Sequence, residues 1–116
     1  MSVIKLLHNP KCSKSRQTLA LLEASAAQVE IIEYLKNPPS AEELRQILGA
    51  LGMSPRQLIR TKESVYLDLN LADTALADPA LITAMVDNPI LIERPIAFKE
   101  GRAVIGRPPE NVLTLL

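Results

Sequence analysis

The sequence predicts an α/β fold in the order strand, helix, strand, helical block, two strands and a final helix. The first observation is a βαβ pattern, in which an apolar run at 3–7 and a run rich in β-branched residues at 29–34 flank a helical pattern over 13–24. Strands connected through one helix in this way pair in parallel by a right-handed crossover. The second observation is a hairpin pattern, with short strands at 96–98 and 103–105 joined by a tight turn. Together the two patterns predict a mixed four-stranded sheet.

The stretch between these two β regions is predicted to be mainly helical. The capping-box pattern Ser40-Ala41-Glu42-Glu43 starts one helix, and Gly52 suits its C-terminal cap. Residues 62–74 are expected to form short helical turns. We therefore expect one domain over residues 1–116, with a helical insertion at about 38–89.

The predicted core is aliphatic, because hydrophobic residues make up 47% of the 116 residues and aromatic residues only 3%. On the first helix the pattern predicts that the apolar face consists of Leu19, Leu22 and Ala26. On the final helix it predicts Val112, Leu113 and Leu116.

Charge and cysteine content argue against several classes of protein. The 13 basic and 13 acidic side chains balance, which favours neither a nucleic-acid partner nor a membrane partner. No apolar stretch is long enough for a transmembrane helix, and the N-terminus does not resemble a signal peptide. The single cysteine excludes an internal disulfide and, with only one histidine, argues against a structural metal site. We expect a cytoplasmic protein that binds no metal.

The only cysteine lies where the first strand gives way to the first helix, in the stretch His8-Asn9-Pro10-Lys11-Cys12-Ser13-Lys14-Ser15-Arg16. The N-terminus of a helix presents unpaired N–H groups and a positive partial charge, which stabilise both a thiolate and a bound oxyanion. A lone cysteine is more often a small buried hydrophobe. The neighbours Lys11, Ser13 and Lys14 do not suit a core, so a reactive cysteine is the favoured interpretation.

This stretch resembles the active-site loop of the glutaredoxin-linked arsenate reductases, the ArsC family. Further motifs resemble the same family and follow in the same order along the chain: Leu58-Ile59-Arg60, Asp87-Asn88-Pro89, Glu93-Arg94-Pro95-Ile96 and Ile105-Gly106-Arg107-Pro108-Pro109-Glu110. The short chromosomal branch of the family is the most similar. The resemblance implies a thioredoxin-like fold that carries a helical insertion.

The resemblance also implies the residues of the site. In this family the cysteine attacks an oxyanion that three arginines hold, and the matching positions are Cys12, Arg60, Arg94 and Arg107. Arginine suits this role because its planar, permanently charged guanidinium offers several donors to an oxyanion. Pro95 matches the cis-proline that thioredoxin-like folds place opposite the catalytic loop. A surface position is the ordinary alternative for an arginine, above all for Arg60.

Three residues near the cysteine are candidates for supporting roles. His8 can orient or polarise Cys12, or it can simply cap the end of the strand. Lys14 and Ser15 are candidates for anion contacts at the start of the helix, whereas Arg16 is expected on the surface.

The resemblance implies an oxidoreductase that reduces arsenate to arsenite through a thiol–arsenic adduct on Cys12. Because the chain has no second cysteine, an external thiol must resolve the adduct. In this family glutathione is the co-substrate and glutaredoxin is the protein partner. No cofactor is expected to stay bound, and the protein is expected to be a monomer.

Two other functions stay open. One is a glutathione-dependent thiol reductase with a different substrate. The other is a Spx-like protein-binding module without enzymatic activity, which contacts a partner such as RNA polymerase. The three arginines favour an oxyanion enzyme over the binding module, and Ser15 stands where the second cysteine of the Spx redox switch would fall. The phosphatase-like arsenate reductases do not fit, because Arg16 follows Cys12 by four positions rather than six.

Overall fold

The computed structural model describes residues 3–116, and the chain divides into two compact units. The first unit joins the N-terminal segment, which ends at Asn37, to Arg94–Leu116. The second unit is Pro38–Glu93. It begins at the first residue of the predicted insertion, 38–89, and extends four residues beyond the predicted end. That the two units form one domain stays a prediction.

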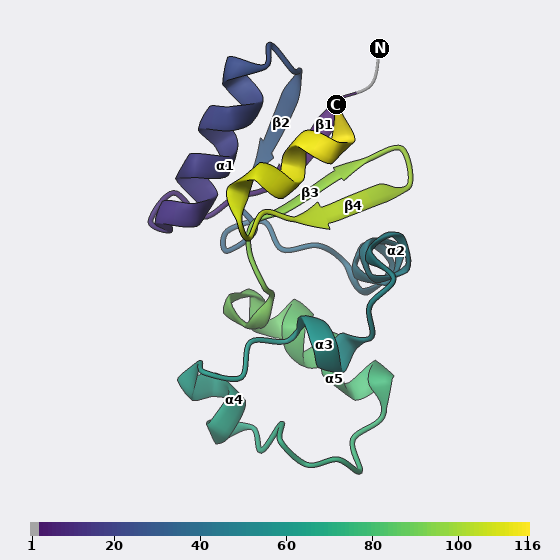
Figure 1. Cartoon of the computed structure of the whole chain (residues 1–116). Coiled ribbons are helices and arrows are strands. Elements are labelled where there is room, and N and C mark those ends of the chain that lie inside the picture. The colour runs from purple at the N-terminus through teal and green to yellow at the C-terminus, as the bar shows by residue number, and fades with distance from the viewer. Residues whose placement is uncertain (1–2) are drawn as a thin grey trace. The chain divides into compact units, whose positions relative to one another are not determined.

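The first unit is built on a mixed four-stranded sheet with the strand order β2-β1-β3-β4 (Figure 1). The strands are β1 (Ile4–Leu7), β2 (Val29–Ile32), β3 (Ile96–Lys99) and β4 (Arg102–Ile105). β1 pairs in parallel with β2 and antiparallel with β3, and β3 pairs antiparallel with β4. This arrangement confirms the predicted sheet and the βαβ unit that begins it.

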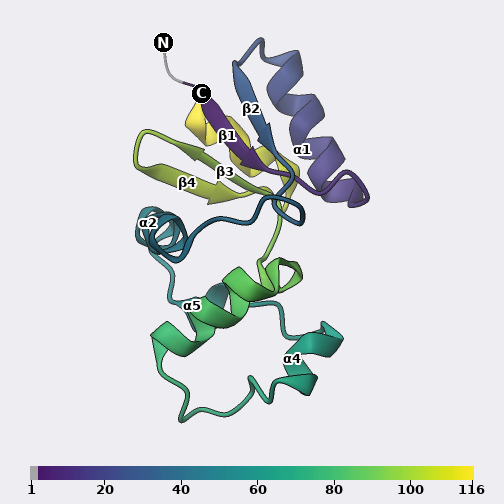
Figure 2. The same cartoon turned by 180° about the vertical axis from the view of Figure 1, so that it is seen from behind.

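Two helices cover one face of this sheet: α1 (Ser13–Ala24), which connects β1 to β2, and the 3₁₀ helix η2 (Pro109–Leu115), which follows β4. Figure 1 shows both helices on that face, and the reverse view in Figure 2 has the strands in front of them. Because side chains alternate along a strand, every second residue of β1 points toward these helices. The buried core between the two layers is aliphatic, as predicted: Ile4, Leu6, Leu22, Ala97, Val112 and Leu115.

The final helix differs from the prediction. It is a 3₁₀ helix, in which every third residue shares a face, so the buried residues are Pro109, Val112 and Leu115. The spacing of an α-helix predicted Leu113 and Leu116 in the core, but these residues are 41% and 54% exposed. The prediction is correct for Val112 alone.

Helix α1 has the predicted bounds, and its predicted apolar face is correct for two of the three residues. Leu22 is buried and Leu19 is partly buried, whereas Ala26 lies beyond the helix, exposed, with φ at 57°. The other buried positions are Ser15 and Thr18. The apolar pattern could not identify them because both side chains are polar and depend on hydrogen-bond partners for their burial.

The second unit is helical. Its elements are α2 (Ala41–Leu51), α3 (Pro55–Leu58), α4 (Ser64–Asp68), α5 (Asp78–Asp87) and the 3₁₀ helix η1 (Pro89–Leu91). The predicted capping box forms at the start of α2, and Gly52 ends that helix in the left-handed conformation. α4 confirms the helical turns predicted within residues 62–74. α5 contacts α2, α3 and η1, so it forms the centre of this unit.

Within residues 3–116, no helix is long and apolar enough to cross a lipid bilayer. The same part of the chain contains no group of three or more His, Cys, Asp and Glu side chains placed to hold a metal ion.

Candidate active site

Cys12 occupies the N-cap position of α1, in the loop that follows β1. Its N–H donates to the Asn9 carbonyl oxygen (3.0 Å), and its own carbonyl oxygen accepts from the Arg16 N–H (3.0 Å). The backbone at Cys12 is extended, with φ −96° and ψ 123°, and the residue is partly exposed. The thiol therefore lies at the positive end of a 12-residue helix, as the sequence predicts.

The pKa of the Cys12 thiol lies below its ordinary value. Partial burial acts to raise this pKa, but the backbone N–H of Ser15, the Arg94 side chain and the backbone N–H of Lys14 lower it, and their combined effect is larger. These donors stabilise the ionised sulfur more than the neutral thiol. More of Cys12 is therefore thiolate at neutral pH than is the case for a free cysteine.

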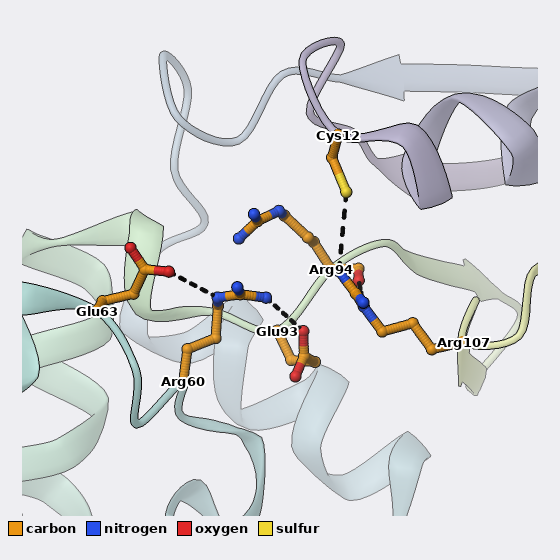
Figure 3. Close-up of polar contacts among 6 residues, drawn as sticks. All are labelled: Cys12, Arg60, Glu63, Glu93, Arg94 and Arg107. Atoms are coloured by element: carbon orange, nitrogen blue, oxygen red, sulfur yellow. Dashed lines mark hydrogen bonds and ion pairs between the residues drawn. The ribbon is translucent and has the colours of Figure 1, made fainter.

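Two of the three predicted arginines, Arg94 and Arg107, contact the sulfur. Arg107 Nη2 lies 3.8 Å from Cys12 Sγ (Figure 3), and the Arg94 side chain hydrogen-bonds to the same atom. Arg107 Nε also donates to the Arg94 carbonyl oxygen (2.7 Å), so the two arginines are linked to each other. The Arg94–Pro95 peptide bond is cis, which confirms the prediction for Pro95, and the Arg107–Pro108 bond is cis as well.

The register of the sheet explains why these residues meet. The last residue of β1 pairs with the first of β3, which in turn pairs with the last of β4: Leu7, Ile96 and Ile105. Cys12 follows β1, Arg94 precedes β3 and Arg107 follows β4. All three loops therefore leave the sheet at the same end, although up to 95 residues separate them in the sequence.

His8 contacts the site through Ser15. His8 Nδ1 lies 2.6 Å from Ser15 Oγ. The same oxygen accepts a hydrogen bond from the Asn9 N–H (3.0 Å). Burial lowers the pKa of His8, so the imidazole is neutral near pH 7 and Nδ1 can accept the Ser15 hydroxyl proton. The Ser15 side chain is fully buried. The Ser15 hydroxyl contacts His8, whereas the Ser15 backbone N–H hydrogen-bonds to the Cys12 thiol and lowers its pKa.

The flanking cations lie at the surface. Lys14 and Arg16 are both exposed, and Arg16 Nη1 donates to the Pro10 carbonyl oxygen (2.8 Å), as expected for a residue that supports the loop. Lys14 contributes its backbone N–H to the thiolate. A contact between the Lys14 side chain and an anion stays a prediction.

Arg60, the third predicted arginine, belongs to the second unit. There its guanidinium is held by two carboxylates: Nε lies 3.1 Å from Glu63 Oε2, and Nη1 lies 2.8 Å from Glu93 Oε1 (Figure 3). The Arg60 N–H donates to the Leu91 carbonyl oxygen (2.7 Å), so the backbone is fixed as well. The side chain of Arg60 is only 19% exposed, unlike that of an ordinary surface arginine. Its part in anion binding stays a prediction.

The sequence-based reasoning did not identify several residues around these arginines. Glu63 and Glu93 were not assigned a role; Arg60 and Glu63 are only three residues apart, but they lie in the turn between α3 and α4 and not within a helix. Gly106 and Thr18 were not singled out either. Gly106 lies within a motif that resembles the family, but its contacts depend on the tertiary fold.

A lone cysteine at the start of the first helix, on a mixed sheet with a cis-proline before β3, is the arrangement of a thioredoxin-like thiol protein. The chain belongs to the ArsC family, whose sequence pattern matches residues 7–115. This match confirms the family that the motifs predict.

Relatives match along almost the whole chain. An arsenate reductase from Haemophilus influenzae is 48% identical over 100% of both chains. The Escherichia coli K12 protein YfgD, described as uncharacterized, is 54% identical over 97% of this chain and 96% of its own. Among solved structures, an arsenate reductase from Vibrio cholerae has a TM-score of 0.95 and 50% identity, with 98% of each chain covered. These similarities confirm the thioredoxin-like fold.

Proposed function

We propose that the protein is an arsenate reductase in which Cys12 is the nucleophile. The observation that carries this proposal is the Cys12 thiol, which has a lowered pKa and is in contact with Arg94 and Arg107. The arsenate reductases among its relatives match almost the full chain, and this similarity supports arsenate as the substrate. The contacts of Cys12 support its role as the nucleophile.

The first step is an attack by the Cys12 thiolate on the arsenic atom of arsenate. A sulfur–arsenic bond forms, and an As–O bond breaks as its oxygen takes up protons and leaves as water. Arg94, Arg107 and the N–H groups at the start of α1 donate to the remaining oxygens, whose charge they stabilise. We assign Arg60 to the same anion, because its motif matches the family and its guanidinium is held in a fixed orientation.

The later steps need external thiols, because Cys12 is the only cysteine of the chain. Two external thiols supply the two electrons that reduce As(V) to As(III). The overall reaction is arsenate plus two thiols to arsenite, one disulfide and water. We assign the thiol to glutathione and the partner protein to glutaredoxin, as in the glutaredoxin-linked members of this family.

The test is arsenate-dependent NADPH oxidation in a mixture of the protein, glutathione, glutaredoxin and glutathione reductase. We expect oxidation that depends on arsenate and that stops when glutaredoxin or glutathione is omitted. No arsenate-dependent oxidation with an active coupling system would contradict the proposal. Turnover of a glutathione mixed disulfide in that case would indicate a thiol reductase, and capture of RNA polymerase without any turnover would indicate a binding module.

A further inference from the structure

Gly106 lies where three segments of the first unit meet: the end of β4, the segment that begins β3, and helix α1. A Cβ atom at this position would lie 2.5 Å from Thr18 Oγ1, 2.8 Å from Pro95 Cγ and 3.1 Å from Thr18 Cγ2. Carbon atoms in folded proteins pack at about 3.5–4.0 Å, so no side chain fits here without movement of its neighbours. Gly106 is buried, and space rather than an unusual backbone angle requires the glycine.

Hydrogen bonds fix this close approach on both sides. The Gly106 N–H donates to the Pro95 carbonyl oxygen (2.9 Å). Thr18 Oγ1 donates to the Lys14 carbonyl oxygen (2.8 Å) and lies 3.5 Å from the Gly106 carbonyl oxygen. The end of β4 is therefore held against Pro95 on one side and against the first two turns of α1 on the other.

The residues next to these contacts are those that reach the sulfur. Arg107 follows Gly106 and contacts Cys12, and Arg94 precedes Pro95 and hydrogen-bonds to the same thiol. Thr18 lies on the helix whose N-cap is Cys12. A displacement at Gly106 therefore changes the distances between both guanidinium groups and the sulfur at once.

We propose that Gly106 is a positioning residue for the Cys12 site, whose missing side chain sets how closely Arg94 and Arg107 approach the sulfur. The effect of Gly106 on arsenate turnover rests on the proposed function. Its effect on the ionisation of Cys12 is independent of that function, and the two effects can be measured separately.

The test is Gly106→Ala, with the pH dependence of Cys12 alkylation by iodoacetamide as the first measurement. Arg94 lowers the pKa of Cys12, so its displacement should raise the midpoint of the alkylation profile. We also expect kcat/KM for arsenate to fall by about 100-fold, the loss typical of a displacement of about 1 Å at a reacting group. A residue that only stabilised the fold would lower the melting temperature and leave the alkylation midpoint unchanged.

Gly49→Ala is the matched control, because a Cβ at that position has no atom within 4 Å. It makes the same chemical change in α2, and neither the alkylation midpoint nor kcat/KM should move. The second variant is Gly106→Ala combined with Thr18→Ala, measured against Thr18→Ala alone. Since it removes two of the three close atoms, we expect it to fold and to recover much of the lost ionisation of Cys12.

The outcomes separate the two proposals. A folded Gly106→Ala protein with the wild-type alkylation midpoint would overturn the positioning role. A folded double variant with the same raised midpoint as Gly106→Ala would assign the displacement to the remaining contact with Pro95 Cγ, and it would still support the positioning role. If the wild-type protein shows no arsenate turnover, a raised midpoint in Gly106→Ala would support the positioning role, whereas the missing wild-type turnover would contradict the proposed function.

Discussion

The two units of the molecule carry opposite charge. The first unit has nine Lys and Arg against five Asp and Glu, whereas the second has four against eight. The balanced charge of the whole chain therefore hides a basic unit that holds the thiol and an acidic unit that holds Arg60. Net charge bounds the partners of a protein only when the charges are evenly spread.

The arginines of the two units also differ in the groups that they contact. Arg94 and Arg107 contact a sulfur, and Arg94 favours the negative form of that sulfur. Arg60 contacts two carboxylates, which fix its direction but offset its charge. We infer that the first unit sets the reactivity of the thiol, whereas Arg60 contributes orientation and affinity. The predictions below test this division, from the largest expected effect to the smallest.

Cys12→Ser should reduce arsenate turnover by more than about 1,000-fold, because a hydroxyl at this place stays protonated and cannot form the sulfur–arsenic bond. The coupled NADPH assay measures this loss. Ser25→Ala, at the other end of α1, is the control and should keep wild-type activity. Turnover by Cys12→Ser near the wild-type rate would remove Cys12 from the mechanism.

Arg94→Ala should lower kcat/KM for arsenate by about 100-fold, the cost typical of losing one donor to a developing oxyanion. The same change should raise the pKa of Cys12, because Arg94 is the side chain that lowers it. The pH profile of alkylation reports the second effect. Arg45→Ala, on the exposed face of α2, is the control. An unchanged profile in Arg94→Ala would contradict the role of the first unit.

Arg60→Ala should raise the KM for arsenate by about tenfold, the loss of one charge-assisted hydrogen bond. The pKa of Cys12 should stay at the wild-type value, since the groups that lower it belong to the first unit. Steady-state kinetics and the alkylation profile measure the two effects. A shift of the alkylation profile in this variant would break the division between the units.

Glu63→Gln and Glu93→Gln should each lower the KM for arsenate by about threefold, because an amide oxygen can keep the hydrogen bond to Arg60 while the negative charge that offsets the guanidinium is lost. The pairs are partly exposed, so the free energy of unfolding should change by less than about 1 kcal/mol. Glu42→Gln, whose pair with Arg45 is long and exposed, should change neither quantity. A KM unaffected by both substitutions would show that the carboxylates do not offset the charge of Arg60.

His8 gives a small pH effect. Burial lowers its pKa in the folded state, so below about pH 6.5 the unfolded chain takes up a proton that the folded protein resists. The free energy of unfolding should therefore decrease as the pH falls from 6.5 to 5, by at most about 1.4 kcal/mol per pH unit. Urea titrations of wild type and His8→Asn measure it. An equal slope in His8→Asn would assign the proton to another group.

The sequence predicts most of the first unit because its signals are local. The apolar run before Cys12 and the two short strand patterns at 96–98 and 103–105 identify the sheet. The start of the α1 pattern places the thiol at the N-terminus of that helix. The site arginines came mainly from the family motifs, and the only local signal was that Arg94 and Arg107 each precede a proline at the end of an element. The end of η2 could not be predicted, because the choice between a 3₁₀ and an α-helix decides whether Leu115 or Leu116 is buried.

The contacts that position the site were beyond the reach of local patterns. Gly106 and Thr18 are 88 residues apart, and their contact follows from the packing of α1 against the end of β4. The link between Arg60 and Glu93 spans 33 residues and depends on the fold of the second unit. A serine is ordinarily expected at the surface, yet Ser15 is buried because its hydroxyl is hydrogen-bonded to His8.

The most direct test of the account is whether arsenate protects Cys12 from alkylation. The account places the anion and the thiolate together, so the rate of alkylation by iodoacetamide should fall in a saturable way as arsenate is added. Sodium chloride at the same ionic strength should have no such effect, and Arg94→Ala should need much more arsenate for the same protection. An alkylation rate that does not respond to arsenate would contradict the account.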